Sequence, residues 1–289
     1  MIFIKSKNKP KIWPNILSVS SILIIICLSP IDAATADEIP QFKEKDRFNI
    51  NIGAFFVRSV KATVRVDKKI GANGPSIGTT LDWRRDLGGE NSTIVPRIDG
   101  YYRFTPYHRL NFGWYKMDLN GQTQLLNDID FGDISIPEGF VIDSVLNIET
   151  YKLAYNYSFF RVKEIEVALS AGLHTMRIVA GIETINKDLQ EKAKFTAPLP
   201  VFGFNLTYSV APKWIAYSKY ELFFIDIADS YSGALSDFVL GVNYQPFKDV
   251  GFTLAANRFN LDADIDSDDY GGALDYVFTG ILFSVNVNY

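Results

Sequence analysis

Beyond residue 37 the chain has no apolar run that approaches about 18 residues, yet apolar side chains recur at every second position in many short segments. A membrane-spanning helix needs about 20 consecutive apolar residues, so helical spans are excluded from this part of the chain. Strict alternation is instead the period of a β-strand with two different faces. Over residues 202–210, Phe, Leu, Tyr and Val alternate with Gly, Asn, Thr and Ser. The pattern predicts an all-β protein.

The first predicted strand, over residues 47–66, carries the longest alternating pattern. Its apolar face comprises Phe48, Ile50, Ile52, Ala54, Phe56, Val60, Ala62, Val64 and Val66. The same parity runs through the whole segment and is interrupted only at position 58, by an arginine. We therefore expect all of these apolar side chains to lie on one face of one strand.

Repetition of the pattern gives about ten strands. They are predicted over 47–66, 93–105, 108–119, 141–159, 164–183, 197–210, 213–226, 232–245, 249–261 and 273–289. Very short connections alternate with longer polar ones, at about 67–92, 120–140, 184–195 and 261–272. Short periplasmic turns and long extracellular loops are typical of transmembrane β-barrels. Residues 78–83 are also strand-like, so twelve strands are the alternative.

In hydrocarbon every backbone N–H and C=O group must be paired within the protein, so only helices or a closed barrel can span a membrane. With helices excluded, the sequence predicts a closed antiparallel up-and-down barrel over residues 47–289. A soluble ligand-binding barrel is the second alternative, and it would place its apolar side chains inside. Bulky aromatic side chains opposite Gly, Asn, Ser and charged residues favour the transmembrane form, with the apolar face toward lipid.

The last strand ends on an aromatic residue. The strands that the outer-membrane barrel assembly machinery recognises end in the same way. Its alternating apolar positions are Ile281, Phe283, Val285, Val287 and Tyr289. We interpret these residues as the assembly signal and expect them to face lipid.

The N-terminal 36 residues have the pattern of a secretory signal. A Lys-rich start precedes the apolar stretch 16–28, and Ala34-Thr35-Ala36 supplies a small-x-small cleavage site. We predict a cleaved signal peptide over 1–36, a short periplasmic segment over 37–46, and export to the outer membrane of a Gram-negative bacterium. The single cysteine lies in the signal, which excludes a disulfide framework.

Several segments resemble a group of proteobacterial outer-membrane barrel proteins loosely described as OmpA- or OmpW-like. They are residues 78–82, 86–88, 100–104, 108–110, 128–133 and 257–259. The resemblance implies a barrel fold and an outer-membrane location, and it implies no catalytic residues.

Both signs of charge fall on the predicted inner face. This lumen charge network comprises Arg97, Asp99, Arg103, Lys152, Glu164, Glu166, His174, Lys219 and Glu221. Buried charges must be paired, so a salt-bridged filling of the barrel is one interpretation and a narrow path for ions or solutes is the other.

A hydrolase or acyltransferase acting on lipid A or phospholipid is the enzymatic alternative, and it depends on His174 near Ser170 and Glu166. Residues four apart on a strand lie about 13 Å apart, so Ser170 and His174 cannot touch, and no nucleophile motif is present. We therefore predict that the chain is not an enzyme.

A dense acidic loop is predicted near the last hairpin. It contains Asp262, Asp264, Asp266, Asp268 and Asp269, and Asp226, Asp229 and Asp237 are expected to extend the same outer rim. Carboxylates of this kind bind divalent cations, which could bridge the loop to lipopolysaccharide phosphates. No other cofactor and no confident metal site is predicted.

A formal net charge of −4 argues against nucleic acid as a partner. The expected partners are outer-membrane lipid, lipopolysaccharide and, during biogenesis, the assembly machinery. The sequence thus predicts an outer-membrane barrel with a structural, surface-interaction or narrow-channel role.

Overall fold

The computed structural model describes residues 47–69, 76–227, 231–266 and 271–289. The predicted signal peptide and the segment 37–46 lie outside this part of the chain. The strands are β1 (Phe48–Lys69), β2 (Ser76–Ile77), β3 (Leu81–Asp82), β4 (Thr93–Thr105), β5 (His108–Gln124), β6 (Ile129–Phe131), β7 (Ile134–Ile136), β8 (Val141–Arg161), β9 (Ile165–Thr184), β10 (Gln190–Ala211), β11 (Trp214–Ile227), β12 (Tyr231–Tyr244), β13 (Val250–Asp266) and β14 (Gly271–Asn288). Among the described residues, no helix is long and apolar enough to cross a membrane.

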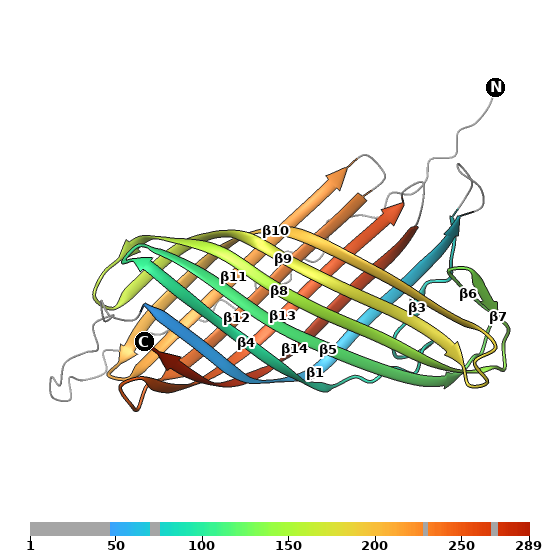
Figure 1. Ribbon diagram of the computed structural model, residues 1–289, viewed down its shortest axis with the longest axis horizontal. Helices are drawn as coiled ribbons and strands as arrows, with labels where there is room; N and C mark the ends of the chain where they lie inside the picture. The colour runs from blue at the N-terminus through green and yellow to red at the C-terminus, as the bar shows by residue number, and fades with distance from the viewer. Residues whose placement is uncertain (1–46, 70–75, 228–230, 267–270) are drawn as a thin grey trace, which may run out of the picture. The chain divides into compact units, whose positions relative to one another are not determined.

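Ten long antiparallel strands form a closed barrel (Figure 1). They pair in the order β1-β4-β5-β8-β9-β10-β11-β12-β13-β14, and β14 pairs with β1 from Asn49↔Asn288 to Asp67↔Gly271. The predicted closed ten-strand barrel is therefore confirmed. The strand-like segment near residue 80 supplies only the two-residue strand β3, which pairs with β1, so it adds no full strand to the barrel.

The two ends of the barrel differ. At the turn end, β1 begins, β14 ends, and adjacent strands are joined by two to five residues, as between β4 and β5 and between β12 and β13. At the opposite loop end lie the β6–β7 hairpin and the connection from β1 to β4 (Figure 1). Two connections predicted as loops are mostly strand, because β9 and β10 extend to Thr184 and Gln190, and β13 and β14 extend to Asp266 and Gly271.

Large apolar side chains point outward around the turn-end half of the barrel. We call this set the apolar belt; it includes Ile52, Phe104, Leu153, Tyr155, Leu169, Phe202, Phe204, Phe224, Leu254, Ile281 and Phe283. Phe202 is 69% exposed and Phe224 62% exposed. Burial of such side chains is the main driving force of folding in water, so their exposure on every side of the barrel indicates an apolar surrounding.

The loop-end half has the reverse pattern. Its interior is filled by a loop-end core, which includes Phe55, Val60, Trp83, Tyr115, Met117, Leu119, Ile142, Leu146, Phe259, Tyr276 and Phe278. Contacts between non-neighbouring strands cross the interior: Tyr276 on β14 donates a hydrogen bond to Met117 Sδ on β5 at 3.0 Å. The outward positions beside this core are polar, for example Lys116, Asp118 and Arg258. In this half, the apolar side chains lie inside the barrel and the polar ones outside, as in barrels that are surrounded by water.

A β-bulge explains why the apolar face of β1 does not stay on one side. The register with β14 shifts between Val57 and Ser59, which inserts Arg58 as an extra residue. An extra residue reverses the side-chain parity beyond it. Phe56 therefore points outward, whereas Val60 is fully buried inside. The prediction that residues 48–66 share one outer face is wrong beyond Arg58.

The segment after β3 closes a gap in the barrel wall, because β4 begins only at Thr93. Val60 N–H donates to the carbonyl oxygen of Asn91 on one side, and Glu90 N–H donates to the carbonyl oxygen of Asn120 on the other. Trp83 of this segment is buried and donates to the Glu90 carbonyl oxygen at 3.0 Å. The segment thus seals the wall and adds an indole ring to the loop-end core.

Candidate functional site

The interior of the turn-end half is polar and encloses a cavity of about 430 Å³. The cavity reaches the turn end, where Pro246, Phe247 and Lys248 of the β12–β13 turn line it. Its basic lining residues are Arg97, Arg103, Arg109, Lys152, Lys213, Lys219 and Lys248, and its acidic ones are Asp99, Glu166, Glu221 and Asp237. Basic groups therefore exceed acidic groups by three, although the whole chain is acidic.

A chain of polar contacts crosses the barrel between the cavity and the loop-end core. Arg97 Nε lies 2.6 Å from Asp99 Oδ2, and Arg97 Nη1 donates to Asn257 Oδ1 at 2.9 Å. Asn257 Nδ2 donates in turn to Asp237 Oδ1 at 2.6 Å. The Asp237 carboxylate accepts a hydrogen bond from Lys152 Nζ, which continues the chain on the far wall. Each buried charge here has an opposite charge beside it, as burial requires.

The same chain continues to the histidine. Lys152 Nζ lies 3.8 Å from Glu221 Oε2, and His174 Nε2 lies 3.1 Å from the same oxygen. His174 is fully buried. The structure therefore places His174 at the end of a structural ion-pair chain.

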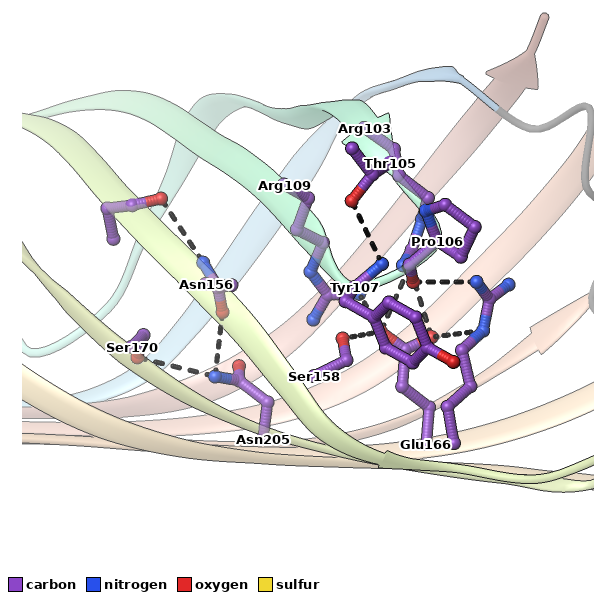
Figure 2. A network of polar contacts seen from close by, with 12 residues as sticks. Arg103, Thr105, Pro106, Tyr107, Arg109, Asn156, Ser158, Glu166, Ser170 and Asn205 are labelled. Carbon is purple, nitrogen blue, oxygen red and sulfur yellow. Dashed lines mark hydrogen bonds and ion pairs between the residues drawn. The ribbon is translucent and has the colours of Figure 1, made fainter.

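A second cluster lies nearer the turn end, around the buried carboxylate of Glu166 (Figure 2). Arg103 Nη2 donates to both of its oxygens, at 3.0 and 3.1 Å, and Ser158 Oγ donates at 2.6 Å. Arg109 Nη1 lies 3.4 Å away and Arg161 Nε 3.8 Å away. One carboxylate thus faces three guanidinium groups, which leaves this cluster with excess positive charge.

The structure places most of the residues of the predicted lumen charge network inside the barrel. Arg97, Asp99, Arg103, Lys152, Glu166, His174 and Glu221 take part in the two clusters above, and Lys219 lines the cavity. Glu164 precedes β9, and none of the described side-chain contacts joins it to either cluster. Glu164 lies outside both clusters because it is in the turn just before β9, at the end of the barrel.

Two members of the network were not predicted as such. Asp237 was expected on the outer acidic rim, but it is 2% exposed and paired with Lys152, so that prediction is wrong. Its parity with Gly241 and Asn243, opposite the apolar Phe238 and Leu240, would have placed it inside. Arg109 could have been found by the same rule, since it alternates with Leu110 and Phe112.

The acidic loop is described only in part, because residues 267–270, with Asp268 and Asp269, lie outside the described residues. Asp262 and Asp275 face each other in register on β13 and β14, above the apolar belt. Asp264 Oδ2 lies 3.4 Å from Arg65 Nη2. Over the described residues, no group of three or more potential metal ligands is found.

The facing carboxylates predict a pH-dependent stability. Burial, then the neighbouring charge of Asp262, raises the pKa of Asp275, and burial and Asp264 raise the pKa of Asp262. A carboxyl whose pKa is raised on folding destabilises the folded state at neutral pH, and this cost disappears when the group is protonated. Asp275→Asn should therefore raise the melting temperature at pH 7 by a few degrees.

The gain should shrink as the pH falls through the pKa of the carboxyl. The measurement is the temperature at which the folded band disappears on a gel, at pH 7 and at pH 4. Asp188→Asn, in the exposed β9–β10 turn, is the matched control and should change neither value. An equal gain at both pH values would contradict the electrostatic explanation.

No protein-family model matches the chain, and no curated protein matches it. The fold is similar to that of the outer membrane protease OmpT of Escherichia coli, with a TM-score of 0.55 and 10% identity over 88% of this chain and 100% of that one. The attachment invasion locus protein Ail of Yersinia pestis and the toluene transporter TodX of Pseudomonas putida also match, with 8% identity each and TM-scores of 0.30 and 0.31. The Ail match covers 81% of this chain and 97% of that one, and the TodX match covers 83% and 90%.

At this level of identity the likeness to OmpT shows the barrel fold alone. The chain therefore has the fold of an outer-membrane β-barrel, and the finer resemblance to OmpA- or OmpW-like proteins is not specifically supported.

Proposed function

We propose that this protein is a barrel of the Gram-negative outer membrane, with the membrane around its apolar belt. The observation that carries the proposal is the exposure of large apolar side chains on all sides of the turn-end half. The predicted assembly signal supports it, since Ile281, Phe283, Val285 and Val287 all point outward and are between 39% and 49% exposed. In this arrangement the turn end faces the periplasm and the loop end faces the outside.

The loop-end half then stands outside the bilayer. Strands such as β8, with 21 residues, rise about 50 Å at a tilt of about 45°, whereas the apolar band of such barrels is about 25 Å tall. The polar outer surface above the belt agrees with contact to water. A rigid extension of this kind suits a structural or surface-interaction role, with lipopolysaccharide as the nearest partner and divalent cations between the acidic strand ends and its phosphates.

We propose further that the barrel does not conduct. Side chains of the loop-end core from non-neighbouring strands meet inside the barrel: the ring centroids of Tyr115 on β5 and Phe278 on β14 lie 6.2 Å apart, and Tyr276 on β14 donates to Met117 Sδ on β5. Further ring contacts between neighbouring strands, such as Phe259 and Phe278 at 5.0 Å, fill the same space. Such a packed interior leaves no continuous aqueous path through the loop-end half. A narrow-channel role is therefore not favoured.

An enzymatic role is not favoured either. The Nε2 atom of His174 is held by Glu221, and Ser170 Oγ accepts a hydrogen bond from Asn205 at 3.3 Å. Among the described side chains, no hydroxyl or thiol is hydrogen-bonded to His174, so a nucleophile–base pair is not formed. We propose that His174 stabilises the barrel interior.

Planar-bilayer recording tests the closed interior. The wild-type protein should give no conductance steps, whereas the double variant Tyr276→Ser, Phe278→Ser should give steps, because it removes two rings from the core. Phe224→Ser, which removes an outward ring from the belt, is the matched control and should stay silent. Folding of each variant is checked by heat-dependent gel migration. Conductance by the wild type would overturn the proposal.

A further inference from the structure

We propose that the cavity in the turn-end half binds a small organic phosphate. The inference rests on the charge balance and geometry of the barrel interior, and it holds whatever the loop end contacts. Basic side chains around the cavity exceed acidic ones by three, and each carboxylate is already engaged by at least one of them. Lys213 and Lys248 are exposed in the turns at the mouth of the cavity, so within the barrel five cations face four carboxylates. The surplus cation inside has no counter-charge of its own, which is costly and favours an anionic occupant.

Arg109 is the first basic group in the cavity whose hydrogen-bonding and charge partners are incomplete. It lines the cavity, and its side chain is only 8% exposed. Its nearest carboxylate, Glu166, is taken by the closer contacts of Arg103 and Ser158. The buried Nε of Arg109 has no hydrogen-bond partner among the described residues. A planar guanidinium in this state can donate to a phosphate through several N–H groups.

Lys219 is the second such group. It lines the same cavity from β11, and its Nζ lies 5.6 Å from the Tyr217 ring centroid. No described carboxylate lies within 4.0 Å of Nζ, because Asp99 is bound by Arg97 and Glu221 by Lys152 and His174. Lys219 and Arg109 line the same cavity from β11 and β5, so both can face one bound anion.

The size and composition of the cavity indicate more than a bare ion. A volume of about 430 Å³ falls in the range of small-molecule sites. Ile215, Val239 and Leu282 supply apolar wall, and Asn51 and Ser209 supply polar groups. The arrangement fits a molecule with one strongly charged group and a small organic body. Entry would be from the turn end, which the cavity reaches.

Isothermal titration of the refolded barrel in a maltoside detergent tests the proposal, with glucose 6-phosphate, inorganic phosphate and glucose as probes. Glucose 6-phosphate should bind and glucose should not. Tighter binding of the ester than of inorganic phosphate would support the proposal, because it shows that the organic body contributes. If inorganic phosphate binds as tightly as glucose 6-phosphate, the cavity does not recognise the organic body, and the proposal of an organic phosphate is overturned. Lys219→Gln and Arg109→Gln should each weaken binding by about ten- to a hundredfold.

Lys194→Gln, an outward charge on β10 above the belt, is the matched control and should leave the affinity unchanged. A second readout separates binding from folding: without ligand, Lys219→Gln should melt no lower than the wild type, because it removes a cation that has no ion pair among the described residues. Glucose 6-phosphate should then raise the melting temperature of the wild type more than that of the variant. Lack of binding by the wild type, or equal affinities in all three variants, would overturn the proposal.

Discussion

Phe283→Arg is expected to prevent stable insertion of the barrel. Phe283 lies within the belt portion of β14, is 48% exposed, and pairs with Ala54 of β1 and Leu254 of β13. If the belt faces lipid, the substitution places a charge in hydrocarbon, which costs about 2–4 kcal/mol near the midplane of such barrels. Because the site also belongs to the closing strand, the loss should appear both in the amount assembled and in the free energy of unfolding from vesicles.

Val277→Arg is the matched control on the same strand. Val277 also points outward, but it lies beyond the belt, beside Asn260 of β13. In water an outward arginine costs little, so this variant should assemble at close to the wild-type level. Urea titration in phospholipid vesicles measures both variants. Equal losses at the two positions would mean that the apolar belt does not mark the membrane.

Glu166→Gln is expected to cause the largest loss among interior variants. The change leaves Arg103 and Arg109, both less than 10% exposed, without the carboxylate that neutralises them. Removal of one partner from a buried ion pair costs about 3–5 kcal/mol, because the remaining charge stays buried and unpaired. The free energy of unfolding, measured in the same vesicles, should fall by about this amount.

Two further variants locate the cause of this loss. Glu183→Gln changes the same residue type on β9, but outside the interior clusters, and should have little effect. Addition of Arg109→Gln to Glu166→Gln should recover part of the lost stability, because it removes one of the unpaired charges. If the double variant is no more stable than Glu166→Gln alone, the loss is one of packing or hydrogen bonding and not of charge.

The barrel could be predicted from the sequence because its strand pairing follows from patterns between residues that are close together in the chain. Alternation, short turns and the helix-free composition define antiparallel neighbours, and each hairpin is closed by residues near in the chain. Above the belt the apolar side chains lie on the inner face instead of the outer one. This change of face was not predicted, although the sequence of β8 indicates it. Its apolar residues change from even positions, as at Leu146 and Ile148, to odd positions, as at Tyr151 and Leu153, without any inserted residue.

The interior clusters were predictable as a set of inward charges, but not as partners. Parity places Arg103 and Glu166 inside, yet their contact joins strands β4 and β9, which are not neighbours. Such cross-barrel pairs depend on strand tilt and register, which alternation does not encode. The bulge at Arg58 was unpredictable for a related reason, since an inserted residue leaves the written pattern unchanged while it reverses the faces.

The seam between β1 and β14 has a consequence for chains that lack the last strand. Each of the other pairings joins barrel strands that follow one another along the chain. The seam instead joins the first and the last of these strands, for example at Asn49 and Asn288. A polypeptide that stops before β14 would therefore expose two unpaired edges, and open edges template aggregation. Closure of the ring therefore removes both open edges at once, and only a chain that includes β14 can complete it.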